Sequence, residues 1–300
     1  MIEYIGIDIG GTNIRIGAIN EKDNIIFLYK ELTFENVITS EDLYVKIKKL
    51  IEKVPNYEQA KAIGIGAPGA INQQFGQIVT SKNISILNKF PLVEKLKQDF
   101  NKPIFLENDA RVATYAEAIK GRGKNHEIVC YITISTGLGG GLVIKSKIYH
   151  GSNNLGAYFA RMILDGKNTS NSLISGTALL KKAKEKIDIK STTELFELAK
   201  RNNPIAKEII EEFKRNLTVL LLNISSTINP DIIILGGGVI KSKDIFLIDV
   251  INDFKGKAHP LAKNTIIDVA SFEQPGVIGA ALLAKYGVNT IYKNEEKYED

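Results

Sequence analysis

The order of strand-like and helix-like segments occurs twice along the chain, and this repeat constrains the fold more than any other feature. In the first part, the expected strands are EYIGIDIGG, NIRIGAI, NIIFLYK, AIGIGAP and PIFLE. The expected helices are SEDLYVKIKKLIEKV, with Ser40 as its N-cap, LVEKLKQDF and one that starts near Asp109. From Glu127 the same order begins again. The sequence therefore predicts two α/β domains, each with a partly parallel sheet.

The second half has longer helices between its strands. Its expected strands are EIVCYITIS, LVIKS, KIYHG, DIIILGGG and NTIIDVASF, and its helices are SGTALLKKAKEKI, TTELFELAKRN, IAKEIIEEFKRNLTVLLLNISSTI and PGVIGAALLAKYG. The longest helix has apolar positions spaced for burial against the sheet, with a dimer partner as the alternative. We place an N-terminal domain at residues 1–118 and a larger one at 119–300, unless the last helix packs on the N-terminal domain. A cleft is expected where strand ends and glycine turns meet.

Composition and charge exclude several classes of function. The 300 residues are 44% hydrophobic and 24% charged, which is typical of a globular chain. The net charge of +5 comes from lysines interspersed with acidic residues, so nucleic acid is not an expected partner. The single cysteine, Cys130, rules out an intramolecular disulfide. We find no signal-like N-terminus and no apolar run of ~18 residues, so we expect a cytoplasmic protein without a membrane partner.

Three glycine turns lie at matching places, each after an apolar strand. They are Gly10 and Gly11 with Thr12, Gly137 with 139–141, and 236–238. Glycine lets the backbone approach a ligand and direct N–H groups at phosphate oxygens, although each turn alone could be a tight hairpin. The first two turns lead into strands and lack dinucleotide spacing, and no Gly-Lys-Ser/Thr follows, so Rossmann and Walker motifs are excluded.

Asp8 precedes the first turn within an otherwise apolar strand. A buried carboxylate needs a partner, and two are open from the sequence. One is a hydrated Mg²⁺ beside nucleotide phosphates. The other is a set of turn N–H groups that donate hydrogen bonds to the carboxylate.

Five segments in this order resemble the successive motifs of the ROK family of sugar kinases and sugar-responsive repressors. They are IGIDIGGTNIRIGAI, GIGAPGAI, LENDARVATYAEAIKGRGK, ITISTGLGGGLVI and NPDIIILGGGVI. The resemblance runs from Ile5 to about Gly287 and implies the two-domain, actin-like, hexokinase-type ATPase fold.

The resemblance also implies the chemistry of the stretch PIFLENDA. It makes Asp109 the catalytic base, which would take a proton from the attacking hydroxyl, and Asn108 a sugar-binding residue. Glu107 is given a structural role, closing the strand or capping the following helix. The alternative for Asp109 is a plain helix N-cap.

The remaining implied site residues bind the sugar or the nucleotide. Gly69 and Asn83 are expected at the sugar. The nucleotide is expected to contact Asp8, with Mg²⁺ held through water, and also Gly10, Gly11, Thr12, Asn13, Thr136, Gly137, Gly139, Gly140, Gly237 and Gly238.

The chain departs from the family pattern in HGSNNLGAYFARMIL. Tyr158 and Arg161 stand where members have the Glu and His of Ala-Gly-Glu-x-Gly-His, and Asn171 stands at a third sugar ligand. The family's zinc-binding cysteines are replaced by LDGKNTSNSLISG, so no zinc is expected. An altered sugar pocket follows, unless the alignment slips here or Arg161 projects to solvent. His126, His150 and His259 lack metal-ligand spacing and are expected to be ordinary polar or surface residues.

An ATP-dependent sugar kinase with Mg²⁺ is therefore the expected function, with a hexose or hexose derivative as acceptor. Arg161 could pair with the carboxylate of a sugar acid. The alternatives are a sugar- or nucleotide-binding protein of weak activity and a sugar-responsive regulator. A regulator is disfavoured because the sequence starts on the first strand, without a helix-turn-helix region. A homodimer is a family expectation only.

Overall fold

The computed structural model describes residues 1–287, which form two compact units. The first contains residues 1–124, 146–156 and 272–287, and the second contains 125–145 and 157–271. The domain boundary at residues 118 and 119 stays a prediction. Residues 288–300 of the larger predicted domain lie outside the described part.

The first unit is built on a five-stranded sheet in the order β3-β2-β1-β4-β7. Its strands are β1 (Tyr4–Ile9), β2 (Asn13–Ile19), β3 (Ile25–Leu32), β4 (Ala62–Ala67) and β7 (Ile104–Asn108). β2 pairs antiparallel with β1 and β3, whereas β1, β4 and β7 run parallel. The parallel strands therefore end at one edge, which is where β7 delivers its last residues.

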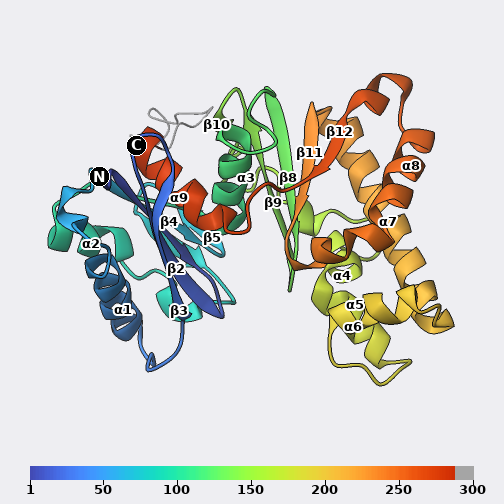
Figure 1. Cartoon of the computed structure of the whole chain (residues 1–300), viewed down its shortest axis with the longest axis horizontal. Helices are drawn as coiled ribbons and strands as arrows, with labels where there is room; N and C mark the ends of the chain where they lie inside the picture. The colour runs from blue at the N-terminus through green and yellow to red at the C-terminus, as the bar shows by residue number, and fades with distance from the viewer. Residues whose placement is uncertain (288–300) are drawn as a thin grey trace. The chain divides into compact units, whose positions relative to one another are not determined.

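Helices cover both faces of this sheet (Figure 1). On one face lie α1 (Ser40–Glu52) and α2 (Leu92–Phe100), and on the other lie α3 (Asp109–Ile119) and α9 (Pro275–Tyr286). The core under α1 and α2 is aliphatic and comes from Leu43, Ile47, Leu96 and the alternating isoleucines of β1 and β2. The loop expected between β4 and α2 also contains a small hairpin, β5 (Ala70–Asn72) and β6 (Gln77–Thr80), and a 3₁₀ turn at Ser85–Leu87.

The last helix of the described chain, α9, packs on strands β1 and β4 and on helix α3. Glycines make this close approach feasible. A Cβ at Gly64 would lie 1.8 Å from the Ala280 carbonyl oxygen, and one at Gly279 would lie 1.7 Å from the Val112 carbonyl oxygen. Helix α9 therefore packs on strands of the first unit, which is the case that the sequence analysis left open for the last helix.

The second unit contains a sheet with the same arrangement, in the order β10-β9-β8-β11-β12. Its strands in this unit are β8 (Ile128–Ile134), β9 (Leu138–Ile144), β11 (Ile232–Gly236) and β12 (Ile266–Val269), whereas the two-residue edge strand β10 (Lys147–Ile148) belongs to segment 146–156 of the first unit. As in the first sheet, the first strand is antiparallel to the second and parallel to the strand on its other side. The predicted duplication of topology is therefore present.

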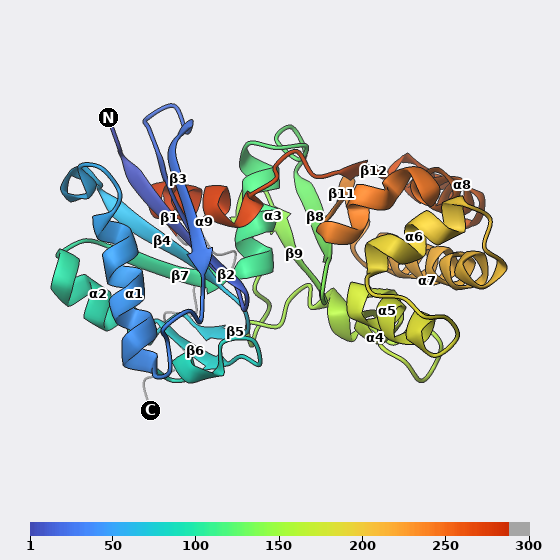
Figure 2. The same cartoon turned by 60° about the horizontal axis from the view of Figure 1, so that its bottom comes forward.

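Five helices of the second unit are seen best in Figure 2. They are α4 (Ser170–Ile174), α5 (Gly176–Lys184), α6 (Thr192–Lys200), α7 (Pro204–Ile228) and α8 (Leu247–Lys257). The core beside α7 includes an aromatic group in which Phe196, Phe213 and Phe246 pack edge to face or tilted. This unit also has 3₁₀ segments at Phe159–Arg161, Gly238–Ile245 and Pro260–Asn264, and the first unit has one at Tyr57–Gln59.

Several local predictions were wrong. Thr39, not Ser40, caps α1, because it forms a capping box with Asp42. The strand expected at 147–151 is only the two residues of β10. Residues 139–141, expected in a glycine turn, lie inside β9, where they pair with residues 131–133.

No helix within residues 1–287 has the length and apolar character needed to cross a membrane.

Candidate active site

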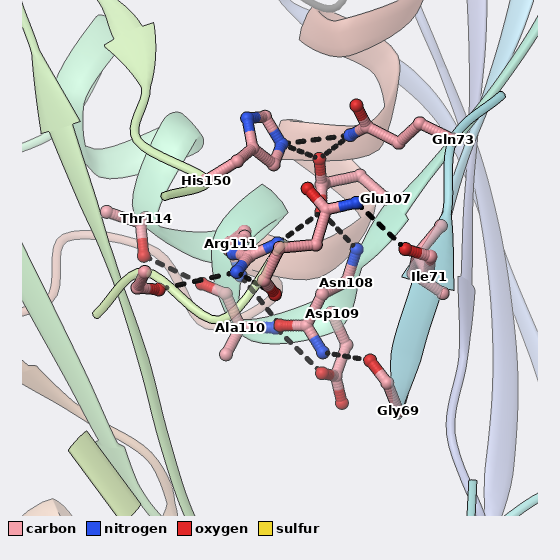
Figure 3. A network of polar contacts seen from close by, with 12 residues as sticks. Gly69, Ile71, Gln73, Glu107, Asn108, Asp109, Ala110, Arg111, Thr114 and His150 are labelled. Atoms are coloured by element: carbon pink, nitrogen blue, oxygen red, sulfur yellow. Dashed lines mark hydrogen bonds and ion pairs between the residues drawn. The ribbon is translucent and has the colours of Figure 1, made fainter. Parts of the chain in front are cut away.

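Asn108 and Asp109 stand where β7 ends and α3 begins, and Figure 3 shows their surroundings. Asn108 is the N-cap of α3, because its Oδ1 accepts from the N–H groups of Ala110 at 3.0 Å and Arg111 at 3.2 Å. Its Nδ2 donates to the Gly69 carbonyl oxygen at 3.1 Å. The capping role considered for Asp109 therefore belongs to Asn108, which retains one amide hydrogen for a ligand.

Asp109 has a carboxylate with one oxygen free. Oδ1 accepts from the N–H of Ala110 at 2.8 Å, Oδ2 makes no contact of that kind within residues 1–287, and the Asn108 side chain lies near enough to the carboxylate to act against the rise in its pKa. Burial, and secondly the negative charge of Asp8, raise the pKa of Asp109 to about 6. A carboxylate with that pKa is ionised at neutral pH and is a stronger base than an exposed aspartate, as general-base catalysis requires.

Asp8 on β1 faces Arg15 across the hairpin. The two residues are paired in register, and Arg15 Nη1 lies 3.2 Å from Asp8 Oδ2. Burial raises the pKa of Asp8 above its ordinary value, although the positive charge and hydrogen bond of Arg15 oppose this. Arg15 is thus a partner of Asp8 that the sequence reading did not weigh, and no turn N–H donates to Asp8 within residues 1–287. Strand pairing around the turn was the signal that could have revealed Arg15.

Asp8 also packs against the first turn of α9, because a Cβ at Gly276 would lie 2.7 Å from Asp8 Cγ. Its Oδ1 accepts no hydrogen bond from the described residues, so one hard oxygen ligand is available. No group of three or more His, Cys, Asp or Glu side chains with metal-site geometry occurs in residues 1–287. A single carboxylate oxygen, Oδ1 of Asp8, fits a Mg²⁺ ion that takes most of its ligands from water and phosphate.

The first glycine turn is a closed hairpin with two free donors. The N–H of Gly10 donates to the Asn13 carbonyl oxygen at 2.9 Å, and the N–H of Thr33 donates to the Thr12 carbonyl oxygen at 3.0 Å. The N–H groups of Gly11 and Thr12 have no acceptor in the described chain. Adjacent free N–H groups of this kind can bind an anion.

Asn83 lies directly against this turn, because a Cβ at Gly11 would be 3.2 Å from the Asn83 Cβ. Gly69 lies between β4 and β5 with φ of +117°, and a Cβ there would be 2.3 Å from the Thr80 carbonyl oxygen. The first unit therefore contains four of the predicted sugar residues, namely Gly69, Asn83, Asn108 and Asp109, and the nucleotide residues Asp8, Gly10, Gly11, Thr12 and Asn13.

The second glycine turn, between β8 and β9, is closed by a side chain. Asn171 Oδ1 accepts from the N–H of Leu138 at 2.8 Å, and the N–H of Ser135 donates to the Gly137 carbonyl oxygen at 2.8 Å. A Cβ at Gly140 would lie 2.5 Å from the Tyr131 carbonyl oxygen, which gives this glycine a packing role. Thr136 accepts through its carbonyl oxygen from the N–H of Thr177.

The third turn follows β11. Gly237 has φ of +90°, and a Cβ there would lie 2.4 Å from the Ile134 carbonyl oxygen. Gly238 is open, because the nearest atom to its added Cβ is Ser135 Oγ at 3.7 Å. Backbone conformation and packing therefore explain the first of these glycines, whereas neither explains the second.

Tyr158 and Arg161, the residues at the departures from the family pattern, lie at a short 3₁₀ turn of the second unit, which Tyr158 precedes and Arg161 ends. Tyr158 is 55% exposed, and Arg161 is exposed and makes no side-chain hydrogen bond or ion pair within residues 1–287. Asn171, the third such residue, uses its amide oxygen to hold the second glycine turn.

Sequence reasoning placed His150 among ordinary polar or surface residues, but it is buried, at 5% exposure. Its Nε2 lies 2.6 Å from an oxygen of Glu107, which is itself fully buried. Partners 43 residues apart leave no local pattern that could have indicated this pair.

The sequence matches the ROK family over residues 4–286. It is 30% identical, over 315 aligned positions, to a glucokinase of Streptomyces coelicolor, covering 94% of this chain and 97% of that protein. It is also 30% identical, over 248 positions, to an N-acetylmannosamine kinase of Vibrio cholerae, covering 78% of this chain and 83% of that protein.

Among solved structures, a ROK family glucokinase from Streptomyces griseus in complex with glucose and AMPPNP superposes with a TM-score of 0.80. Its sequence is 26% identical, and the match covers 95% of this chain and 99% of that one. The predicted two-domain, actin-like fold of the hexokinase type is thereby confirmed. The chain belongs to the ROK family.

Proposed function

We propose that this protein is an ATP-dependent sugar kinase that transfers the γ-phosphate to a hydroxyl of a hexose or hexose derivative. The observation that carries the proposal is the partly buried carboxylate of Asp109, which has a raised pKa and one free oxygen. The glucokinase and N-acetylmannosamine kinase relatives supply the class of acceptor.

Asp109 acts as the general base in this proposal. Its Oδ2 accepts a hydrogen bond from the acceptor hydroxyl and takes the proton as the bond from the hydroxyl oxygen to the γ-phosphorus forms and the bond from that phosphorus to the departing ADP breaks. Asn108, held by the helix cap and by Gly69, offers its remaining amide hydrogen to a second sugar oxygen. Because little covalent chemistry is asked of the protein, the position of these groups determines the rate.

The nucleotide is proposed to bind through backbone donors and charge. The free N–H groups of Gly11 and Thr12 would bind phosphate oxygens, next to Gly10 and Asn13. When bound, Mg²⁺ neutralises phosphate charge, and Asp8 would hold it through water. In the second unit the proposed nucleotide residues are Thr136, Gly137, Gly139, Gly140, Gly237 and Gly238, and the proposed sugar residues are Tyr158, Arg161 and Asn171.

The test is ADP release from Mg-ATP with a panel of neutral hexoses, N-acetylhexosamines and sugar acids. Asp109→Asn is assayed in parallel, and Asp188→Asn, at an exposed position, is the matched control. We expect one acceptor class to be turned over by the wild type and the control but not by Asp109→Asn.

If the protein bound nucleotide and sugar without any ADP release, a binding or regulatory role would replace the kinase. Omitting Mg²⁺ should abolish turnover, and sedimentation at assay concentrations would decide whether the active species is the expected homodimer. A cytoplasmic location remains part of the proposal.

A further inference from the structure

We propose that Glu107 is a positioning residue that fixes Asn108 and Asp109 by binding three separate segments of the first unit at once. The inference rests on the proposed function and deepens it, because it assigns the fixed geometry of the acceptor residues to a side chain that does not touch the substrate. The network is drawn in Figure 3.

Both oxygens of the Glu107 carboxylate are occupied, and the side chain is fully buried. Oε2 accepts from Gln73 Nε2 at 2.5 Å, and Oε1 accepts from the N–H of Asn108 at 2.7 Å and faces Arg111 Nη1 at 3.4 Å. Burial alone would raise the pKa of Glu107, but the hydrogen bond and charge of His150, the charge of Arg111 and the Asn108 N–H together hold it below its usual value. The group is therefore a buried anion, which persists only while these partners remain.

His150 donates to this anion through Nε2. The Nε2 atoms of His150 and Gln73 are 2.9 Å apart, and both lie against Oε2 of Glu107, at 2.6 Å and 2.5 Å. Since Oε2 is the acceptor they share, each nitrogen directs a hydrogen at it. The other ring nitrogen of His150, Nδ1, is buried and has no partner among the described residues. Nε2 is thus the atom through which this ring acts.

Arg111 binds the loop that follows His150. Its Nη2 donates to the carbonyl oxygens of Asn154 at 2.7 Å and Gly156 at 3.3 Å. The loop is closed on itself, because the N–H of Gly156 donates to the His150 carbonyl oxygen at 2.7 Å. Asn154 Nδ2 also donates to the Ile71 carbonyl oxygen at 3.2 Å. The loop therefore contacts both the start of α3 and the β5 strand.

Glu107 stands at the junction of segments 69–73, 107–111 and 150–156. These contain Gly69, Asn108 and Asp109, three of the residues proposed to meet the sugar. If Glu107 lost its charge or one of its donors, the cap of α3 and the bond from Asn108 to Gly69 would shift together. A displacement of about 1 Å can lower a rate by about 10²-fold, because catalysis depends on near-attack geometry.

The experiment uses His150, because glutamine and asparagine imitate different ring nitrogens. His150→Gln places an N–H near the position of Nε2, whereas His150→Asn places it near Nδ1. We expect kcat to fall about 10-fold to 100-fold in His150→Asn and in Glu107→Gln, with KM for ATP changed by less than about twofold. His150→Gln should keep kcat within about threefold of wild type. Equal losses in His150→Gln and His150→Asn, or normal kcat in Glu107→Gln, would overturn the proposal.

A second measurement does not depend on kinase activity. Amide hydrogen exchange of the ligand-free proteins should become faster at residues 107–112 and 69–73 in His150→Asn but not in His150→Gln. The sheet of the second unit should be unchanged in both. A wild type without sugar-dependent ADP release would remove the proposed function, and the exchange pattern would still decide the network. Unchanged exchange in His150→Asn would refute it.

Discussion

The two sheets share one topology, yet their glycine hairpins differ in what closes them. Around the β1–β2 turn there are a carboxylate and a guanidinium, Asp8 and Arg15, and two backbone N–H groups without acceptors. The β8–β9 turn is closed by an asparagine side chain, and the strand pair Thr133–Gly139 stands where the first hairpin has the ion pair.

The difference shows that duplication of a fold does not duplicate its chemistry. Charge and unpaired groups, which cost stability, gather at the first hairpin beside Asp109. The second hairpin also leaves two N–H groups, those of Thr136 and Gly137, without acceptors in the described chain, but it has close packing at Gly140 in place of the ion pair. Substitutions in the first region should therefore affect activity most, whereas those at Gly140 and Asn171 in the second should also lower stability.

The largest expected effect separates activity from stability at Asp109. Asp109→Asn should lower kcat by about 10²-fold to 10⁴-fold, because the proton acceptor is removed. The same change should raise Tm at pH 8. The folded-state pKa of about 6 lies above the unfolded value of 3.8, so ionisation costs stability as pH rises through about 6. A Tm below that of the wild type at pH 8, measured by calorimetry, would contradict this account.

The pH profile gives the next effect. If ionised Asp109 is the base, kcat/KM should be level above pH 7 and fall about tenfold for each pH unit below 6. The residual activity of Asp109→Asn should lack this step. A wild-type profile that stays flat down to pH 5 would exclude Asp109 as the titrating base.

In the second hairpin, Gly140→Ala should lower stability. Its Cβ would lie 2.5 Å from the Tyr131 carbonyl oxygen and 2.6 Å from Phe159 Cδ2, and overpacking of this kind costs about 1–3 kcal/mol. Gly256→Ala is the matched control, because nothing lies within 4 Å of its Cβ in helix α8. Urea denaturation should show a loss for the first and a small gain for the control. Equal midpoints would show that the strand can move aside.

The smallest effect concerns the asparagine that closes the second turn. Asn171→Ala leaves the N–H of Leu138 without its acceptor and should cost about 1 kcal/mol. Asn171→Asp keeps an acceptor oxygen and should lose less. If both variants unfold at the wild-type urea midpoint, water replaces the side chain, and Asn171 does not stabilise the second hairpin.

Periodic patterns in the sequence predicted much of the fold, but they did not predict the pairings between distant residues. The bounds of α2 match the expected helix, because its apolar residues recur at helical spacing and αL Asn101 ends it. The hairpin of β5 and β6 was missed, because three- and four-residue strands are too short to show alternation. Gly139 and Gly140 were placed in a turn, because glycine in a strand resembles turn sequence.

The sequence predicted where Asn108 and Asp109 stand in the fold, but not which side chains support them. The motif resemblance placed Asn108 and Asp109 at a strand end, which is where they lie. The ion pairs around them involve Arg15, whose position follows from strand register, and His150, which lies before a loop that returns to α3. Pairing around the hairpin could have indicated Arg15, whereas the contact of His150 arises from tertiary packing that no single-sequence pattern encodes.

The return of α9 to the first unit has a consequence for synthesis. β1 is made long before the helix that covers it, Pro275–Tyr286. Until α9 has been made, the strand face that it covers stays exposed on the growing chain. A nascent chain should therefore acquire the carboxylate environment of Asp8 only after the whole of the second unit has been synthesised and α9 is available.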